Sequence, residues 1–464
     1  MKGTGEAPTH VFSTAVEQKI AERTRTLVVG PYLAPASRAR FGETNSRDND
    51  ARLDEARGLA LAIDLNVVDA VIAPLRAPRP ATYIGSGKVE ELKGRVEAEE
   101  IGLVMMDCAL SPIQQSNLEK ALGAKVIDRT GLILEIFGRR ARTREGALQV
   151  ELAHLSYQKG RLVRSWTHLE RQRGGFGFLG GPGETQIEAD RRLLQDRMRR
   201  IEKELESVTR TRGLHRASRD KVPFPTVALV GYTNAGKSTL FNRLTRAEVL
   251  AKDMLFATLD PTTRLVTMPH GDKVILSDTV GFISDLPTLL VAAFRATLED
   301  VVEADLILHV RDIAHEDAEA QSEDVARILA ELGVGEDRRS RIIEVWNKAD
   351  LLPEQERERL FNVTRIGQPG ERPMLVSAIT GEGIDALRLE IEARLTQGHA
   401  RYSVVVPAED GAAAAWLHDN ATVLERRMTD EDQVAFEIKV APERVARLER
   451  RFGAAARRHP AGAD

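Results

Sequence analysis

The segment GYTNAGKS at residues 231–238 constrains the fold of this chain more than any other feature. It matches the pattern G-x-x-x-x-G-K-[ST], a glycine-rich turn whose backbone N–H groups surround phosphate oxygens. An apolar run at 227–230 precedes it and a helical pattern at 239–244 follows it. We therefore predict a strand, a phosphate-binding loop and a helix whose N-terminus faces the phosphates. Lys237 would reach the β and γ phosphates, and the Ser238 hydroxyl would ligate Mg²⁺.

A second motif, DTVG at 278–281, follows a predicted strand at 274–276. A carboxylate at the end of a strand beside the loop can hold the hydrated Mg²⁺, and the Gly281 amide can approach the γ phosphate because no side chain blocks it. The next residue is Phe282, at a position where many GTPases carry a glutamine that orients the attacking water. A phenyl ring cannot hold water for attack, so we expect slow intrinsic hydrolysis that depends on a group supplied from elsewhere.

Two later motifs indicate which base is bound. A predicted strand at 342–346 ends in NKAD, residues 347–350. The Asp350 carboxylate can accept hydrogen bonds from N1–H and N2–H₂ of guanine but would leave the edge of adenine unpaired. A strand at 374–376 leads into Ser-Ala-Ile at 377–379, where a backbone amide could donate to guanine O6. The four motifs occur in the order found in translation-factor-related GTPases, so we predict an enzyme that hydrolyses GTP to GDP and phosphate.

The segment DMLFATLDPTTR at 253–264 lies between the first two motifs. In a GTPase, a threonine hydroxyl of this switch segment completes the Mg²⁺ shell and senses the γ phosphate. On sequence alone, this role could belong to Thr258, Thr262 or Thr263. We favour Thr258, because Phe-x-Thr-Leu resembles the first switch of related GTPases.

The rest of the chain suggests further domains. Apolar runs alternate with helical patterns between 26 and 138, which predicts a parallel sheet covered by helices. Two heptad-like stripes, from Leu148 to Leu162 and from Leu194 to Val208, flank a segment with six glycines between Gly174 and Gly183. They predict an antiparallel helical hairpin with a flexible tip.

We thus expect a multidomain α/β protein. Its predicted parts are a flexible amino terminus (1–25), an α/β amino-terminal domain (26–138), a basic helical hairpin with a glycine-rich tip (139–221), a P-loop GTPase domain (222–399), a small α/β carboxy-terminal domain (400–452) and a flexible tail (453–464). In the carboxy-terminal domain we expect strand, helix, strand and helix, near 402–406, 412–418, 434–440 and 442–451.

Charge is distributed unevenly along these parts. The formal net charge of the chain is −4, which as a total argues against a nucleic-acid binder. Residues 139–221, however, contain 20 Lys and Arg against 11 Asp and Glu, so the hairpin is basic and the remainder acidic. The glycine-rich tip adds Phe176 and Phe178, whose rings can stack on unpaired bases. The alternative to RNA binding is that the hairpin has only a solvated charged face and a flexible turn.

Composition also limits the compartment. The single cysteine, Cys108, cannot form an intramolecular disulfide or a cysteine zinc site. No apolar run is long enough for a signal peptide or a membrane helix, so we expect a cytoplasmic protein without stable membrane insertion.

Long stretches of the sequence resemble the HflX family of ribosome-associated GTPases. They are ATYIGSGKVEEL (81–92), DRTGLILEIFGRRARTREGALQVELAHLSY (128–157), RLVRSWTHLERQRGGFGFLGGPGETQIEADRR (161–192) and the GTPase motifs with the LFATLDPTTR switch. This resemblance implies binding to the large ribosomal subunit and its rRNA, and dissociation of stalled or idle ribosomes, particularly under stress, with ribosome-stimulated hydrolysis. The family also has a hydrophobic residue where Phe282 stands.

The resemblance carries the family's site residues onto this sequence. It assigns Mg²⁺ to Ser238 and Thr258, and with the motifs it makes Lys237, Thr258 and Gly281 the catalytic candidates. It supports RNA contact by Arg171, Arg173, Phe176 and Phe178. The predicted GTP- and GDP-binding residues are Gly231, Tyr232, Thr233, Asn234, Ala235, Gly236, Lys237, Ser238, Phe256, Ala257, Thr258, Leu259, Asp260, Asp278, Thr279, Val280, Gly281, Asn347, Lys348, Ala349, Asp350, Ser377, Ala378 and Ile379.

Two alternatives stay open at this point. One is an RNA-binding switch in which GTP sets affinity, hydrolysis resets it, and no ribosome is split. The other is a tRNA-modification GTPase, which the position of Cys108 disfavours because it is not in the C-terminal motif that such proteins use. We expect the free protein to be monomeric.

Overall fold

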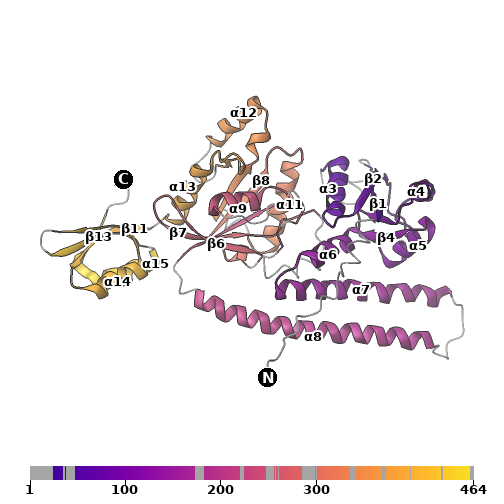
Figure 1. Cartoon of the computed structure of the whole chain (residues 1–464), viewed down its shortest axis with the longest axis horizontal. Helices are drawn as coiled ribbons and strands as arrows, with labels where there is room; N and C mark the ends of the chain where they lie inside the picture. Colours follow the sequence, from indigo (N-terminus) through magenta and orange to yellow (C-terminus); the bar gives the residue numbers. More distant parts are fainter. Residues whose placement is uncertain are drawn as a thin grey trace, which may run out of the picture.

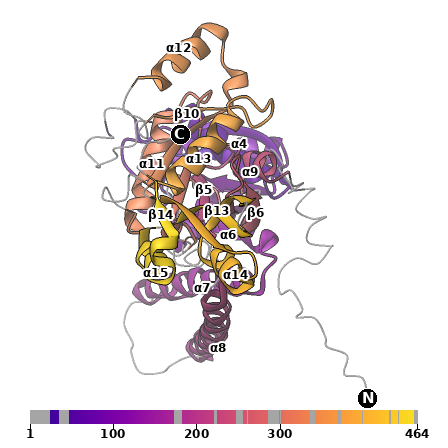
Figure 2. The same ribbon diagram turned by 90° about the vertical axis from the view of Figure 1, so that its left-hand side faces the viewer.

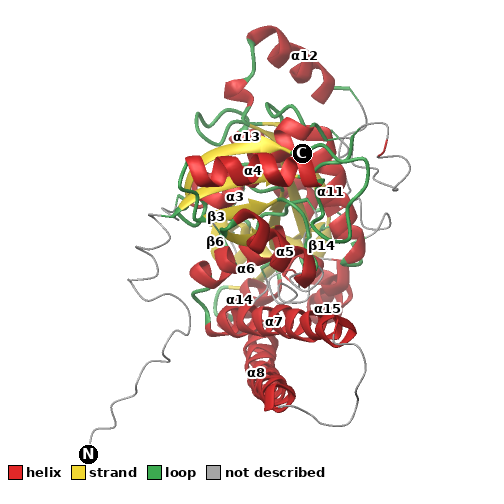
Figure 3. Cartoon of the chain, turned by 90° about the vertical axis from the view of Figure 1, so that its right-hand side faces the viewer, coloured by secondary structure: helices red, strands yellow, loops and turns green. Residues whose placement is uncertain are grey.

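The computed structural model describes residues 24–34, 37, 47–172, 182–219, 224–246, 255–256, 258–259, 261–284, 298, 300–334, 341–366, 372–397, 399–429, 432–440 and 442–459. The N-terminal domain and the C-terminal domain lie on opposite sides of the P-loop domain (Figure 1). Two long helices run along one side of this body, and the views in Figures 2 and 3 place them outside the sheets. The multidomain α/β architecture expected from the sequence is confirmed.

The N-terminal domain is built on a parallel sheet of four strands in the order β2-β1-β3-β4. Along β1, Leu27 and Val29 belong to a core that includes residues of α4 and α5, whereas Val28 belongs to a second core that includes residues of α3 and α6. This alternation follows from the two-residue period of a strand. The elements are β1 (Arg25–Gly30), α3 (Asn49–Leu61), β2 (Asn66–Ile72), α4 (Ser86–Ala98), β3 (Leu103–Met106), α5 (Pro112–Leu122), β4 (Lys125–Asp128) and α6 (Arg129–Arg140).

The helical hairpin consists of α7 (Arg144–Gln172) and α8 (Pro182–Arg219). The two helices lie side by side (Figure 1), and an ion pair of 2.8 Å joins Arg197 of α8 to Glu151 of α7. Asp128, the N-cap of α6, accepts hydrogen bonds from Tyr157 at 2.5 Å and Arg161 at 2.7 Å. The hairpin is thus anchored to the N-terminal domain through α7.

The P-loop domain contains a six-stranded sheet in the order β10-β9-β8-β5-β7-β6, parallel except for β6 at one edge. Ala228 and Val230 of β5 belong to one core, and Val227 and Leu229 belong to the other. The elements are β5 (Thr226–Gly231), α9 (Lys237–Thr245), β6 (Thr262–Thr267), β7 (Lys273–Asp278), β8 (Leu306–Asp312), α11 (Ala318–Glu331), β9 (Ile342–Asn347), η3 (Ala349–Leu351), α12 (Glu354–Thr364), β10 (Met374–Leu375) and α13 (Ile384–Leu395).

The C-terminal domain has an antiparallel sheet in the order β12-β13-β11-β14, with Tyr402, Val404 and Phe436 in its core. Its elements are β11 (Ala400–Pro407), α14 (Gly411–Asn420), β12 (Thr422–Met428), β13 (Gln433–Val440), α15 (Pro442–Phe452), η4 (Gly453–Ala455) and β14 (Ala456–Arg458).

Two expectations for this region need correction. The strand β12 is an additional element, and residues 453–459 are not a flexible tail. Instead, β14 pairs with β11, and the amide of His459 donates to the carbonyl of Arg401 at 2.9 Å. This edge strand satisfies backbone groups of β11 that would otherwise be unpaired. Residues 460–464 lie outside the described part, as do residues 1–23.

One apolar core spans two domains. Leu59 of α3 and Phe137 of α6 belong to the same buried cluster as Tyr232, Val280 and Phe282 of the P-loop domain. Because the cluster is continuous, separating the two domains would expose apolar surface to water. The N-terminal domain is therefore docked directly beside the two glycine-containing motifs of the predicted nucleotide site.

Candidate functional site

The phosphate-binding loop connects β5 to α9, as predicted. At Gly231 a Cβ atom would lie 2.1 Å from the carbonyl oxygen of Val310 on the neighbouring strand, so only glycine fits there. Gly236 has φ = +88°, and a Cβ there would lie 2.3 Å from the side-chain nitrogen of Asn347. The helix α9 begins at Lys237, so its first amides face the loop. A helix N-terminus in this position favours an anion.

Lys237 is buried, and its Nζ donates to the carbonyl oxygens of Gly231 at 3.1 Å and Tyr232 at 2.7 Å. Burial lowers the pKa of Lys237 to about 8, although the nearby Asp278 carboxylate opposes this shift. A phosphate bound beside Lys237 would raise the pKa of its ammonium group again, because an opposite charge within a few ångströms favours the charged form.

Three oxygen-bearing side chains converge beside the lysine. The hydroxyl groups of Ser238 and Thr258 lie 2.8 Å apart. They donate to Oδ2 of Asp278 at 2.7 and 2.9 Å, respectively. Oδ1 of the same carboxylate is buried and has no hydrogen-bond partner in the described part of the chain. Burial raises the pKa of Asp278, against the lowering effect of these hydrogen bonds and of Lys237.

These oxygens fit a hard divalent cation. Mg²⁺ prefers oxygen ligands and usually takes one or two from the protein, with the rest from water and phosphate. The described residues contain no group of three or more His, Cys, Asp and Glu side chains that could hold a metal ion by themselves. A cation at this position would therefore depend on the hydroxyl groups, with Asp278 beside them. Of the three competing threonines, the structure brings Thr258 to this cluster, while Thr262 and Thr263 lie in β6.

The DTVG motif lies directly against the loop. The amide of Thr233 donates to the carbonyl of Phe282 at 2.7 Å, and the amide of Phe282 donates to that of Gly231 at 3.1 Å. A Cβ at Gly281 would lie 2.8 Å from Cγ2 of Thr233 and 3.1 Å from Nζ of Lys237. Glycine is thus required at 281 by the closeness of the loop. Thr279 and Val280 are buried beside it.

The NKAD and Ser-Ala-Ile motifs meet at the far end of the loop. Asn347 is 1% exposed; its amide group donates to the carbonyl of Ala235 at 2.9 Å and accepts from the amide of Ala378 at 3.0 Å. Ser377 donates to Asp350 at 2.5 Å. These bonds bring the side chain of Asp350 and the backbone of Ala378 to the same end of the loop. The amide of Ala349 donates to the carbonyl of Val376 at 3.2 Å, and Ile379 is 70% exposed.

Sequence reasoning missed the partner of Lys348. Its Nζ forms an ion pair of 2.7 Å with Asp312, the last residue of β8. Lys348 itself has φ = +66°, which is unusual for a residue other than glycine. The only signal in the sequence was a carboxylate at the end of an apolar run, LILHVRD.

Several predicted residues lie apart from this cluster or outside the described part. Phe256 and Leu259 are buried at the interface with the N-terminal domain, where the Phe256 ring packs 4.7 Å from that of Phe137. Asn234 is exposed in the loop with φ = +61°. The predicted residues Ala257, Asp260, Arg173, Phe176 and Phe178, and the side chain of Arg171, lie outside the part that the structure describes. No helix in that part has both the length and the apolar character of a membrane span.

Family models match four successive parts of the chain. They are described as GTP-binding GTPase N-terminal at residues 50–138 and GTP-binding GTPase Middle Region at 140–219. The model for 50S ribosome-binding GTPase matches 226–348, and that for HflX C-terminal domain matches 363–462.

Full-length relatives agree with these matches. The chain is 52% identical over 400 residues to the GTPase HflX of Magnetococcus marinus, covering 86% of this chain and 90% of the relative. It is 42% identical over 396 residues to the GTPase HflX of Escherichia coli (strain K12), covering 85% and 91%, respectively. It is also 42% identical over 404 residues to the GTPase HflX of Caldanaerobacter subterraneus, covering 87% and 91%. The protein binds guanine nucleotides and hydrolyses GTP, and the chain belongs to the HflX family of GTPases.

Proposed function

We propose that this GTPase binds the large ribosomal subunit and its rRNA in the cytoplasm and dissociates stalled or idle ribosomes, as part of a stress response. The observation that carries the proposal is the basic hairpin of α7 and α8, which lies outside the compact domains (Figures 2 and 3). Residues 139–221 have 20 basic and 11 acidic side chains, and a basic excess attracts nucleic-acid phosphates. The match to a model for 50S ribosome-binding GTPases supports the large subunit as partner.

The proposed nucleotide chemistry follows from the cluster around Lys237. Lys237 and the amide of Gly281 would stabilise the negative charge that develops on the γ phosphate. Ser238 and Thr258 would hold Mg²⁺, which when bound neutralises charge on the β and γ phosphate oxygens. Asp350 and the 377–379 backbone would select guanine, and the remaining motif residues would line the nucleotide.

Phe282 supports slow hydrolysis in the free protein. Its side chain is 1% exposed and belongs to the core shared with the N-terminal domain, so it offers no polar group to a water molecule. A group from the ribosome would then complete the site and stimulate hydrolysis. The alternative, an RNA-binding GTP-dependent switch that never splits ribosomes, uses the same site and differs only in what binding does to the ribosome.

We predict that replacing Arg171, Arg173, Phe176 and Phe178 by alanine weakens binding to large subunits by about 100-fold or more, because phosphate attraction and base stacking are both lost. Affinity for GDP should stay unchanged. Co-sedimentation with purified large subunits in the presence of a non-hydrolysable GTP analogue measures the effect.

The matched control for this variant lies on α12 and at its C-cap. Arg359 and Phe361 of α12 and the C-cap residue Arg365 are exposed and offer the same residue types away from the hairpin. Their triple alanine variant should still co-sediment. Equal binding by the hairpin variant and the unmodified protein would refute the proposed contact.

A further inference from the structure

The loop at residues 377–381, proposed to contact the guanine base, is only partly fixed by burial. Ser377 is fully buried and Ala378 is 6% exposed, whereas Ile379 is 70% exposed. The side chain of Ile379 thus makes little contact with the core, and burial does not set the orientation of its backbone. The peptide groups of this part of the loop must therefore be held by hydrogen bonds.

Two amide groups of the loop have acceptors within the domain. That of Ala378 donates to the side-chain oxygen of Asn347 at 3.0 Å, and that of Thr380 donates to Oγ of Ser377 at 3.1 Å. The amide of Ile379, which lies between them in the sequence, has no acceptor among the residues that the structure describes. It is therefore available to donate to O6 of guanine.

The side chain of Arg243 holds the carbonyl groups of this loop. Its Nε donates to the carbonyl of Ala378 at 3.1 Å, and its Nη2 donates to the carbonyl of Ile379. The carbonyl of Ala378 and the amide of Ile379 belong to one planar peptide unit, in which C=O and N–H point in opposite directions. A guanidinium group that fixes this carbonyl therefore also fixes the direction of the amide.

The residue types at 243 and 381 fit this arrangement. A Cβ at Gly381 would lie 3.3 Å from Nη2 of Arg243, which is closer than an ordinary van der Waals contact. A side chain at 381 would thus press on the guanidinium group. The rigid fork of an arginine can donate to two neighbouring acceptors at once, whereas a lysine offers a single point charge on a flexible chain.

Arg243 also connects the base loop to the phosphate-binding loop. It lies in the last turn of α9, the helix that begins at Lys237. Leu240 and Leu244 of this helix belong to the same apolar core as Ala378. The helix that faces the phosphates and the loop proposed for the base are thus joined both by apolar packing and by the arginine. A site ordered in this way before the nucleotide arrives loses less entropy when it binds.

We propose that Arg243 is a positioning residue for guanine recognition, which directs the amide of Ile379 toward O6 of the base by holding the carbonyls of Ala378 and Ile379. This inference rests on the proposed placement of guanine at Asp350 and residues 377–379. Arg243 acts through the backbone of the loop and contacts neither the base nor the phosphates. Its loss should therefore weaken nucleotide binding without changing the chemical step.

The test compares Arg243→Ala and Arg243→Lys with the unmodified full-length protein. Displacement of a bound fluorescent nucleotide analogue measures the affinities for GDP and for 6-thio-GDP, in which sulfur, a weak acceptor, replaces O6. We expect Arg243→Ala to bind GDP about tenfold more weakly, because hydrogen bonds to a charged group contribute an amount of this order. Its affinity for 6-thio-GDP should fall by no more than about twofold, since the contact with O6 is already weakened in that ligand.

Steady-state hydrolysis gives a second readout. In Arg243→Ala the KM for GTP should rise by about tenfold while kcat at saturating GTP stays unchanged, the pattern of a lost interaction that the ground state and the transition state share. Arg243→Lys should lie between Arg243→Ala and the unmodified protein. If Arg243→Ala fails to fold, Arg243→Lys decides, because it keeps the charge and most of the side chain.

Arg388→Ala provides the matched control. Arg388 of α13 also donates to a backbone carbonyl of another element, that of Thr267 at 2.8 Å. This variant should keep the nucleotide affinities of the unmodified protein. The proposal is overturned by an unchanged affinity of Arg243→Ala for GDP, by equal losses for GDP and 6-thio-GDP, by a lowered kcat, or by an equal loss in Arg388→Ala. A wrong placement of the base gives a different result, because Asp350→Asn would then leave the preference between GTP and xanthosine triphosphate unchanged.

Discussion

Replacing Lys237 by alanine should abolish measurable GTP hydrolysis, with kcat falling by about 100-fold or more and nucleotide affinity falling as well. Removing one preorganised charge stabiliser from an enclosed site has effects of this size. The ammonium group is buried and lies 3.1 Å from the position that a Cβ at Gly281 would take, next to the amide that we place against the γ phosphate. Steady-state release of phosphate and GDP binding measure the two effects.

Lys88 offers a matched control for this variant. It lies in α4 within the segment GSGK, and its side chain forms an ion pair of 2.6 Å with Glu91 at the surface. Lys88→Ala removes the same positive charge and should leave GTP hydrolysis unchanged. Hydrolysis that survives in Lys237→Ala, or that is lost equally in Lys88→Ala, would contradict the assignment of the phosphate site.

Asp350→Asn should exchange the base that the enzyme prefers. The carboxylate is proposed to accept from N1–H and N2–H₂ of guanine, whereas an asparagine amide would oppose its own donor to N2–H₂. A site that hydrogen-bonds one ligand can reject, by about 10⁴-fold, a second ligand that leaves its buried polar groups unpaired. We therefore expect the affinity of Asp350→Asn for GTP to fall by about 10³-fold. Xanthosine triphosphate carries an oxygen in place of the N2 amine, so its affinity should rise.

The fold should tolerate this change. Ser377 donates to Oδ1 of Asp350, and the side-chain oxygen of asparagine can accept the same bond. Asp385→Asn is the control, because that side chain is 97% exposed at the start of α13. Displacement of a bound fluorescent nucleotide analogue by GTP and by xanthosine triphosphate measures the preference. An unchanged preference in Asp350→Asn would place the base elsewhere.

The arrangement of the GTPase motifs was largely predictable because each motif is a short segment. Each is a few residues long and follows an apolar strand, so the sequence indicates the element that carries it, while the role of each residue stays a prediction. The structure adds what spacing alone left open, namely that Thr258 rather than Thr262 or Thr263 reaches Ser238 and Asp278.

Edge strands were harder to predict. The strand β12, TVLERRM, carries charged residues that do not alternate cleanly, and β14 consists of Ala456 and two arginines. Strands at an edge are partly solvated, so their apolar pattern is weak. These segments form strands because β13 and β11 offer backbone partners, which is tertiary information.

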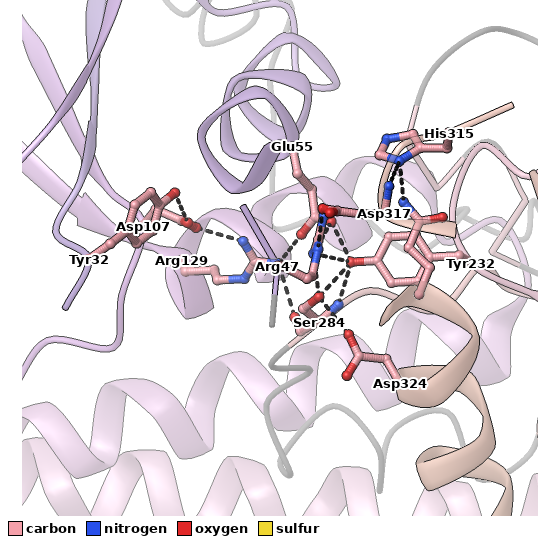
Figure 4. A network of polar contacts seen from close by, with 11 residues as sticks. Tyr32, Arg47, Glu55, Asp107, Arg129, Tyr232, Ser284, His315, Asp317 and Asp324 are labelled. Atoms are coloured by element: carbon pink, nitrogen blue, oxygen red, sulfur yellow. Dashed lines mark hydrogen bonds and ion pairs between the residues drawn. The ribbon is translucent and has the colours of Figure 1, made fainter. Parts of the chain in front are cut away.

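The polar network that joins the N-terminal domain to the P-loop domain (Figure 4) could not be predicted at all. Arg47 and Asp317 are 270 residues apart, and Glu55 and Tyr232 are 177 residues apart. Single charged residues at such separations carry no local pattern. The sequence predicted Tyr232 as a nucleotide-binding residue of the loop. Its hydroxyl donates to Glu55 and accepts from Arg47 of the N-terminal domain, and it also accepts from the amide of Ser284 in its own domain.

The proposed function requires the GTP-bound protein to separate ribosomal subunits. Light scattering of intact ribosomes, mixed with the full-length protein and a non-hydrolysable GTP analogue, measures this separation. We predict that scattering falls with the analogue and stays constant with GDP, because binding in the GTP state supplies the work and hydrolysis only releases the protein. Constant scattering in every nucleotide state, with the protein still bound to large subunits, would contradict the proposed function and leave an RNA-binding regulatory switch.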